Sequence, residues 1–538
     1  MPVQDVNDNG KIFLGLDSST QGLKATAIAA DFRVLAEHSV NYDADLPEFK
    51  TAGGVHRDGL AVTAPPLMWL AALDLLLAHL KASGLPLKNV AAISGSGQQH
   101  GSVYMRVAAR DMLRTLAPKL QLRKQLGDLF ARSESPIWMD SSTTQQCRER
   151  DAALGGPQAT ATLTGSRSYE RFTGNQIAKI CDLEPGVYAA TERIALVSSF
   201  MASLLIGDYA PIDASDGSGM NLMDLWSKQW SAAALDVTAP ELGEKLGPIV
   251  ASHATIGKIH RYYAVRYGFS PDCRIIAFSG DNPNSLAGLR LEHTGDIAIS
   301  MGTSDTVFGS LAKPVPSAEE GHIFANPIVP DAYMALICYK NGSLTRERIR
   351  DERVGGSWDR FNAALGRTKP GNGGCIGFYI QEPEITPPIL ATGVHRFGPD
   401  DNPVENMSDD NEVRAVVEGQ FLSMRLHGAR IGLEPRNILA TGGASSNAAI
   451  LRIMADVFGV PVLTADRPNS ASLGATYRAL NGWKCGEADR FVSFAEVMAG
   501  APPFTKAADP DMRAHAVYGE MLGRYEKLER LVIRRASA

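Results

Sequence analysis

The chain has 538 residues, of which 44% are hydrophobic and 21% charged, and its formal net charge is -6. This is the composition of an ordinary soluble protein, and the length predicts two or more domains, each with its own core. No long basic stripe occurs, which argues against nucleic acid or an anionic membrane surface as the main partner.

The cysteines and the N-terminus predict a cytoplasmic protein. The six cysteines show no CxxC or Cys/His spacing, which argues against a disulfide framework or a zinc site. The first residues, MPVQDVNDNG, are polar and acidic, unlike a signal or transit peptide. The most apolar stretch, IALVSSFMASLLIG (194–207), is too short to span a bilayer and predicts a core helix instead.

The first hundred residues predict a mixed α/β order. Residues 12–16 and 23–30 read as the two strands of a hairpin around SSTQG, and 33–40 as a third strand. Residues 66–83 carry apolar side chains at helical spacing, and this stretch is opened by Pro65 and Pro66 and closed by Gly84. The following NVAAISGSGQQHG predicts a buried strand that ends in a glycine-rich turn. The resulting order of strands and helices differs from the order found in a doubly wound dinucleotide-binding unit.

A second opening of the same kind occurs midway along the chain. GDIAISMGTSDTVFGSLA (295–312) again has a short apolar strand, a turn of Gly, Ser, Thr and Asp, and a second apolar strand. This weak internal repeat predicts two related domains, residues 1–290 and 291–538.

The last part of the chain predicts further α/β structure. NILATGGASSNAAILRIMADVFGVPV reads as strand, glycine turn, helix and strand. The C-terminal VYGEMLGRYEKLERLVI predicts a packed amphipathic helix. Its proposed buried face consists of Val517, Met521, Tyr525, Leu528 and Leu531.

Three turns after predicted strands are candidates for phosphate binding. They are DSSTQG (17–22), GTSDT (302–306) and TGGASSN (441–447). Backbone N–H groups in such turns form anion-binding nests, and hydroxyl groups add donors. Small-residue turns are common, so one alone is a weak signal. Three in one chain, two of them in repeated hairpins, favour phosphate as the ligand, although no P-loop motif is present.

Two aspartates at predicted strand ends are candidates for the chemistry. A carboxylate at Asp17 repels phosphate unless a cation lies between them, and Mg²⁺ typically binds one or two carboxylates plus phosphate oxygens. Asp281, in FSGDNPNSLAG, is placed to accept a proton from a hydroxyl group, with Asn282 beside it. For both residues the sequence leaves a second reading open, namely a cap on the local turn or helix.

Polar residues in two other segments suit a neutral, hydroxylated ligand. SGSGQQHG places Gln98, Gln99 and His100 in one glycine-framed turn. Arg171 precedes a predicted helix that starts near Asn175, and is either a ligand contact or a surface salt-bridge partner.

Taken together, these motifs resemble the FGGY family of carbohydrate kinases, over residues 12 to 533 and in the family's order. Within it they are most similar to the branch that acts on xylulose, in its animal form. The motifs are GLDSSTQGLKA, SGSGQQHG, WMDSSTTQQC, TGSRSYERFTGNQIAKI, SDGSGMNL, SGDNPNSLAGLRL, ISMGTSDT, GHIFANP and ATGGASSNAAILRIMADVFGVPV. The resemblance implies two ribonuclease H-like domains of the actin/hexokinase type with an interdomain active-site cleft, the sugar on the first domain and ATP mainly on the second.

The resemblance also implies roles for individual residues. Asp281 corresponds to the catalytic base, and Asp17 to the Mg²⁺ carboxylate. The sugar-binding residues are His100, Arg171, Asp281 and Asn282, to which the turn itself adds Gln99. The nucleotide-binding residues are Ser18, Ser19 and Thr20 in the first hairpin, Gly302, Thr303 and Ser304 in the second, Gly443, Ala444 and Asn447 at the adenosine turn, and Trp358 beside the nucleotide.

The implied reaction is ATP-dependent phosphorylation of D-xylulose to D-xylulose 5-phosphate with Mg²⁺, by a monomer or homodimer whose partners are small molecules. One alternative is another kinase of the family that acts on ribulose, glycerol or a gluconate-type acid. A second is a non-catalytic sugar or nucleotide sensor on the same fold, which has no need of the Asp281 base.

Overall fold

The computed structural model of the protein describes residues 10–465 and 469–537 and separates them into two compact units. Unit 1 contains the residues up to Glu292 together with Phe324–Asp331 and Asn469–Pro502, and unit 2 contains the remainder. Asn469–Pro502 therefore clusters with unit 1, although it lies within the range 291–538 that was expected to form the second domain.

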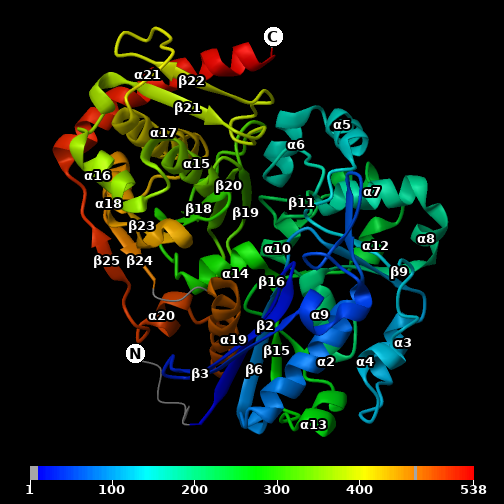
Figure 1. Ribbon diagram of the computed structural model, residues 1–538. Helices are drawn as coiled ribbons and strands as arrows, with labels where there is room; N and C mark the ends of the chain where they lie inside the picture. Colours follow the sequence, from blue (N-terminus) through cyan, green and yellow to red (C-terminus); the bar gives the residue numbers. More distant parts are fainter. Residues whose placement is uncertain (1–9, 466–468, 538) are drawn as a thin grey trace. The chain divides into compact units, whose positions relative to one another are not determined.

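Unit 1 is built on a mixed seven-stranded sheet (Figure 1). The strand order is β14 (Thr255–Lys258), β15 (Arg274–Ile276), β6 (Val90–Gly97), β1 (Ile12–Ser18), β2 (Gly22–Ala29) and β3 (Val34–Asn41), with the short β16 (Ser279–Gly280) also paired to β6. Strands β1, β2 and β3 are antiparallel to one another, and β6 runs parallel to β1. The predicted hairpin, the third strand and the α/β class are confirmed.

Two helices cover β1 from opposite sides. Leu14 and Leu16 belong to the apolar cluster of α2 (Pro66–Ala82), the helix predicted over 66–83. On the other side, Phe13 meets a tryptophan of α19 (Ser470–Ala488), with ring centroids 5.5 Å apart. A Cβ on Gly15 would lie 2.1 Å from the Ser472 carbonyl oxygen, so only glycine allows α19 to approach β1 this closely.

The prediction of a helix over 194–207 is wrong at its start. Residues 194–196 belong to the strand β9 (Thr191–Leu196), which pairs antiparallel with β7 (Ser102–Arg106), and the helix α9 spans Val197–Ile206. A short apolar run fits a buried strand as well as a buried helix, and here the partner strand decides. In the described part of the chain, no helix is long and apolar enough to cross a membrane.

Unit 2 repeats the arrangement of the first sheet. Its strand order is β19 (His322–Ala325, of which the first two residues belong to unit 2), β20 (Tyr333–Tyr339), β18 (Asp305–Leu311), β17 (Asp296–Met301), β23 (Asn437–Thr441), β24 (Val462–Thr464) and β25 (Thr505–Ala508). The hairpin β17–β18 lies beside the parallel strand β23, just as β1–β2 lies beside β6. The predicted repeat of the opening hairpin is confirmed.

The helices of unit 2 include the predicted C-terminal helix. They are α15 (Ser343–Val354), α16 (Trp358–Arg367), α17 (Asp409–Arg430), α18 (Ala448–Phe458) and α21 (Met512–Ser537). Met521, Tyr525 and Leu528 of α21 are buried as predicted, but Val517 is 38% exposed. Tyr518 packs in the core in its place, because the buried face is centred one residue further along the helix.

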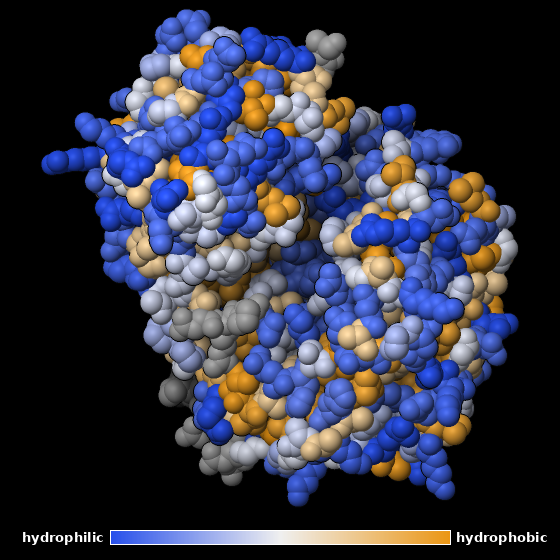
Figure 2. Space-filling view, viewed as in Figure 1, coloured by the Kyte–Doolittle hydropathy of each residue, from blue (hydrophilic) through white to orange (hydrophobic). Residues whose placement is uncertain are grey.

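The surface and the thiols agree with the composition. On the face shown in Figure 2, hydrophobic residues occur in small groups separated by hydrophilic ones. All six cysteines are free thiols, as their spacing predicted.

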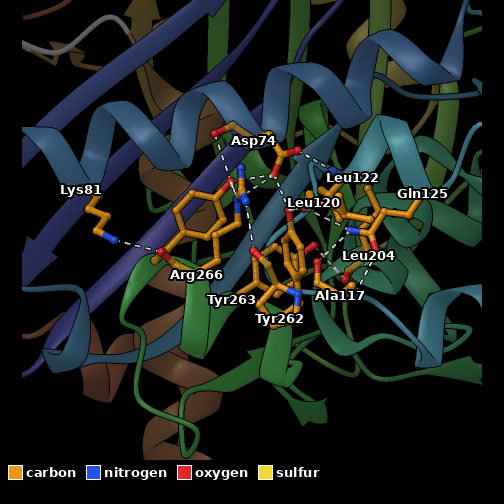
Figure 3. A network of polar contacts seen from close by, with 12 residues as sticks. Asp74, Lys81, Ala117, Leu120, Leu122, Gln125, Leu204, Tyr262, Tyr263 and Arg266 are labelled. Carbon is orange, nitrogen blue, oxygen red and sulfur yellow. Dashed lines mark hydrogen bonds and ion pairs between the residues drawn. The ribbon is translucent and has the colours of Figure 1, made fainter.

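A buried carboxylate ties three helices of unit 1 together (Figure 3). Asp74, in the middle of α2, is 7% exposed. Its Oδ1 accepts hydrogen bonds from the hydroxyls of Tyr262 (2.9 Å) and Tyr267 (2.6 Å), both on α13 (Arg261–Tyr267). Its Oδ2 accepts from Leu122 N at 2.6 Å, at the start of α4 (Leu122–Gln125). Arg266 Nε lies 4.0 Å from Oδ1 and supplies the compensating charge.

We expect Asp74→Ala to lower the free energy of unfolding by about 3 kcal/mol, because it leaves Leu122 N without its acceptor and takes the accepting carboxylate away from two buried hydroxyls. The hydroxyls keep only their bonds to backbone carbonyls, Tyr262 to Leu120 O at 3.0 Å and Tyr267 to Asp74 O at 3.3 Å. Tyr262→Phe removes one donor from a carboxylate that keeps others, and is expected to cost only about 1 kcal/mol. Urea denaturation of the two variants checks this order. A larger loss for Tyr262→Phe than for Asp74→Ala contradicts the assignment of Asp74 as the centre of the network.

A buried histidine bridges two glutamates in unit 2. His427 on α17 is 0% exposed, with Nδ1 2.7 Å from Glu320 Oε2 and Nε2 3.1 Å from Glu529 Oε1. Burial alone lowers the pKa of His427, but the hydrogen bonds to the two glutamates outweigh it and raise this pKa from 6.5 to about 9. The imidazolium therefore links α17 to α21 and to the segment before β19.

The His427 bridge predicts a pH dependence of stability. His427 stays charged up to about pH 9 in the folded protein but only to about pH 6.5 in the unfolded chain. Its contribution, roughly 3 kcal/mol, is complete below pH 6.5 and is lost as the pH rises through 9. Urea denaturation between pH 6 and 10 should show this decline in the wild type and a smaller one in His427→Gln. Equal declines in both proteins refute the bridge.

Candidate active site

The turn of the first hairpin carries Asp17 at the end of β1. Asp17 lies opposite Lys24, and Ser19 N donates to Gly22 O at 3.0 Å to close the turn. The Asp17 side chain is buried; its Oδ2 accepts from Ser19 Oγ at 2.6 Å and its Oδ1 from Ser96 Oγ at 2.5 Å. Asp17 thus caps its own turn, and the remaining lone pairs of its oxygens are free for a cation or its water shell.

The three hydroxyl residues after Asp17 lie in different surroundings. Ser18 is 0% exposed, and its Oγ is 3.2 Å from the Tyr42 hydroxyl in the core. Ser19 and Thr20 are partly exposed at the turn, where Trp138 Nε1 donates to Thr20 Oγ1 at 2.9 Å. Ser19 and Thr20 can therefore present side chains to a ligand, whereas the Ser18 hydroxyl points into the core.

The predicted sugar turn follows β6 and is buried. Gln98, Gln99 and His100 are all less than a tenth exposed, and His100 has a left-handed backbone with φ 68°. His100 Nδ1 lies 2.8 Å from Gly219 O, so Nδ1 carries the proton of the neutral ring. Burial, and then the charge of Arg171, lower the pKa of His100 to about 3. The ring is neutral at pH 7, and its Nε2 is an acceptor for a hydroxyl group.

Strand pairing brings Asp281 to the same sheet end as Asp17. The short β16 runs parallel to β6 with Gly280 opposite Gly97, and β1 runs parallel to the other side of β6 with Ser18 opposite Gly97. Asp281 directly follows Gly280 and begins α14 (Asp281–Gly288).

The Asp281 carboxyl is held in place and its pKa is raised. Its Oδ1 accepts from Asn282 N at 2.8 Å, and Asn282 Nδ2 donates to Gln99 Oε1 at 2.8 Å. Burial, and then the negative charge of Asp17, raise the pKa of Asp281 from 3.8 to about 7. A carboxylate with this pKa is suited to accept a proton at neutral pH. The structure thus joins Asp17, Asp281, Asn282 and Gln99 in one site.

A residue that sequence reasoning missed fixes the start of α14. Asn284 is 0% exposed and donates from Nδ2 to Gly95 O (3.1 Å) and Gly280 O (2.9 Å). Its Oδ1 accepts from Arg478 on α19 at 3.0 Å. Every polar atom of this amide is satisfied, so Asn284 anchors the backbone that presents Asp281.

Arg171 is available to a ligand. Its guanidinium carbon lies 5.2 Å from the centre of the Tyr169 ring and 5.6 Å from that of Phe172, whose own ring packs on His100. No hydrogen bond or ion pair holds Arg171 within residues 10–465 and 469–537. This finding argues against the surface salt bridge that the sequence left open.

The second hairpin and the glycine turn of unit 2 line one pocket. The pocket has a volume of about 800 Å³, within the size range of small-molecule sites. All nucleotide residues predicted in unit 2 line it except Ser304: Gly302, Thr303, Trp358, Gly443, Ala444 and Asn447. Residues that the sequence did not single out complete the lining, among them Ser343, Leu344, Glu347, Asn362 and Ser446.

Two of these residues show how the pocket is shaped. A Cβ on Gly443 would meet no atom within 4 Å, so the backbone there is open to a ligand. The Asn447 side chain is already engaged: its Oδ1 accepts from Ala449 N and Ile450 N to cap α18, and its Nδ2 donates to Asn362 Oδ1 at 2.9 Å. Asn447 therefore lines the pocket while it organises the first turn of α18.

The aspartate of the second hairpin has a structural role. Asp305 and Arg346 form an ion pair with both side chains 0% exposed and two contacts, at 2.7 and 3.0 Å. Arg346 also donates to Ser343 Oγ at 2.7 Å, and Ser343 N donates to Gly302 O at 3.1 Å. The pair thereby locks the turn of the hairpin to the start of α15.

The residues present fit a magnesium ion that is bound together with nucleotide phosphates. Among the described residues, no group of three or more His, Cys, Asp or Glu side chains offers a purely protein-made metal site. Mg²⁺ characteristically keeps several waters and uses one or two carboxylates plus phosphate oxygens. The Asp17 carboxylate, whose negative charge lies next to Asp281, is a metal ligand of that kind.

Comparison with known proteins gives matches over almost the whole chain. Residues 134–288 match the N-terminal domain, and residues 297–483 the C-terminal domain, of the FGGY family of carbohydrate kinases. Xylulose kinase of Mus musculus is 53% identical over 525 residues, which is 97% of this chain and 94% of that protein. Xylulose kinase 2 of Arabidopsis thaliana is 46% identical over 544 residues, 97% of each chain.

The fold has a counterpart among solved structures. The crystal structure of xylulose kinase from Rhodospirillum rubrum matches with a TM-score of 0.81 at 17% identity, over 98% of this chain and all of that one. This likeness confirms the predicted fold of two ribonuclease H-like domains of the actin/hexokinase type. The chain belongs to the FGGY family of carbohydrate kinases, phosphotransferases that use ATP with Mg²⁺.

Proposed function

We propose that the chain transfers the terminal phosphate of Mg-ATP to the 5-hydroxyl of D-xylulose, giving D-xylulose 5-phosphate and ADP. The observation that carries this proposal is the position of the Asp281 carboxyl, at the same sheet end as Asp17 and beside the hydrogen-bonded pair of Asn282 and Gln99. Burial and the neighbouring Asp17 charge also raise its pKa to about 7. The identity of 46% and 53% to two xylulose kinases supports D-xylulose as the acceptor.

The sugar is bound by unit 1 in this proposal. His100 Nε2 accepts from a sugar hydroxyl, and the unpaired Arg171 guanidinium donates to sugar oxygens. Gln99 Nε2 is buried without a hydrogen-bond partner in the described structure, so it also has a donor to offer. Asn282, fixed by Gln99 and Asp281, completes the set. Arg171 is the one cation in this set, and the Asp281 carboxyl is part of the same set, so the site suits a neutral polyol better than a sugar acid.

The nucleotide is bound by unit 2. Gly443 and Ala444 line the adenosine side of the pocket, and the Trp358 ring offers an apolar surface there, backed by Phe361 at 5.1 Å between ring centres. The Gly302–Thr303 turn offers backbone N–H groups to phosphate oxygens. Ser19 and Thr20 offer hydroxyl groups from the hairpin of unit 1.

In the transfer step, Asp281 takes the proton of the 5-hydroxyl as the new O–P bond forms. The bond between the γ-phosphorus and the β,γ-bridging oxygen breaks, and ADP leaves with that electron pair. Positioning and charge stabilisation dominate such reactions, so a well-placed carboxylate is sufficient as the base. Asp17 would hold Mg²⁺, which would supply neutralisation of the phosphate charge when the nucleotide is bound.

Asp281→Ala tests the role of the base. We expect kcat to fall by roughly 10²–10⁴-fold, because the proton acceptor is lost. Asp272→Ala, which removes a carboxylate with 79% of its side chain exposed in the same unit, serves as the matched control and should retain wild-type kcat. Thermal unfolding confirms that both variants are folded. Near-normal turnover by folded Asp281→Ala contradicts the proposal.

A substrate panel tests the acceptor. D-xylulose, D-ribulose, glycerol and gluconate are each incubated with Mg-ATP, and phosphorylated product is measured by mass spectrometry. We expect the highest kcat/KM with D-xylulose. A higher value with any other acceptor overturns the choice of D-xylulose, and bound sugar and nucleotide without any sugar phosphate overturns the kinase reaction itself.

A further inference from the structure

A second carboxyl group, Asp216, is buried next to the proposed base. It lies on the short helix α10 (Ala214–Ser218), which follows β10 (Ile212–Asp213), and is 2% exposed. Its Oδ2 accepts from Ser198 Oγ on α9 at 2.5 Å. A buried carboxyl without a bound cation is costly unless it is neutral or paired.

The other oxygen of Asp216 faces the backbone that precedes Asp281. Asp216 Oδ1 is buried and has no hydrogen-bond partner in the described structure. A Cβ on Gly280 would lie 2.7 Å from this oxygen and 2.4 Å from Gln99 Cγ, so both side chains pack closely against Gly280. Gln99 Nε2 is likewise buried and unpartnered. An acceptor and a donor without partners thus lie on the same side of Gly280, the residue before the base.

The charges around Asp216 are mostly negative. The neighbouring Asp213 accepts hydrogen bonds from the hydroxyls of Ser252 and Ser279 and from Asp216 N. The titratable or charged groups that face this cluster are Asp213 on β10, Asp281 on α14, Arg478 on α19, His100 after β6 and His253 before β14. Arg478 is the buried cation among them.

Under these conditions Asp216 is neutral at pH 7. Burial, and then the charges of Asp213 and Asp281, raise the pKa of Asp216 to about 8, although Ser198 and Arg478 act in the opposite direction. The adjacent Asp281 ionises with a pKa of about 7. Two coupled carboxyl groups of this kind titrate in separate steps, and the base is the one that ionises first.

We propose that Asp216 is a positioning residue for phosphoryl transfer. As a neutral acid it keeps Gln99 and the Gly280–Asp281 turn in the arrangement that the reaction needs, and when it ionises it draws Gln99 and this turn out of that arrangement. This inference rests on the proposed function, since it assumes that Asp281 is the base. It assigns to Asp216 no contact with the sugar or the nucleotide.

Two physical effects make the ionised form of Asp216 inactive. A carboxylate at Oδ1 attracts the unpartnered Gln99 Nε2, and thereby strains the contact between Gln99 Oε1 and Asn282 Nδ2. It also adds a negative charge beside Asp281, which disfavours the approach of the anionic phosphates in a low-dielectric site. Both effects lower kcat/KM as the pH rises through 8.

The test is the pH profile of kcat/KM for D-xylulose. In the wild type we expect a bell, which rises through pH 7 as Asp281 ionises and falls roughly tenfold from its maximum by pH 9. Asp216→Asn mimics the neutral acid and cannot ionise, so its profile should lack the fall at high pH. Asp74→Asn, which alters another buried carboxyl of unit 1, is the matched control and should keep the fall.

A second variant keeps the inference open to refutation if Asp216→Asn does not fold. Ser198→Ala removes a hydrogen bond that favours the ionised carboxyl, and should move the alkaline limb upward by about 0.7 pH unit. An alkaline limb that is unmoved in Ser198→Ala, or retained in folded Asp216→Asn, overturns the inference.

A readout without substrates separates this inference from the proposed function. Infrared spectra of the wild type at pH 7 should show a protonated carboxyl band that titrates near pH 8 and is missing in Asp216→Asn. An identical band in that variant overturns the inference. A wild type that shows the band but forms no sugar phosphate contradicts the proposed function, and with it the role of Asp216 in phosphoryl transfer, while the ionisation of Asp216 itself stands.

Discussion

Repulsion between the carboxylates of Asp17 and Asp281 is the interaction on which the proposed chemistry depends. Strands β1 and β16 lie on either side of β6 and end at the same level, so the two side chains share one buried sheet end. The Asp17 charge adds to the effect of burial and raises the pKa of Asp281 to about 7. The same repulsion favours a cation at this place, which is where Mg-ATP must bring its charge.

Much of the surrounding structure serves to maintain this unfavourable pair. Asn284 ties the start of α14 to β6, and Arg478 reaches Asn284 from α19, a helix that lies almost two hundred residues further along the chain. Gly15 allows that helix to pack directly on β1. Unit 1 therefore uses a segment from the last part of the chain to fix its reacting groups, and this explains why Asn469–Pro502 clusters with it.

The sequence was sufficient to predict those features that depend on local pattern. The hairpins, the strand ends that carry Asp17 and Asp281, and the glycine turn at Gly443 all have short-range signals. It could not predict where single side chains point in strands covered on both faces: β1 is buried throughout, so no alternation showed that the Ser18 hydroxyl faces Tyr42. Nor does any local signal reveal contacts between distant residues, such as Asn447 with Asn362 or Asp216 with Gly280.

A structure with D-xylulose, Mg²⁺ and a non-hydrolysable ATP analogue tests the central claim most directly. The account predicts that the 5-hydroxyl oxygen of the sugar lies within about 3 Å of an Asp281 carboxylate oxygen, the distance needed for proton transfer. A bound sugar whose 5-hydroxyl is hydrogen-bonded to another group, with Asp281 out of reach, contradicts it.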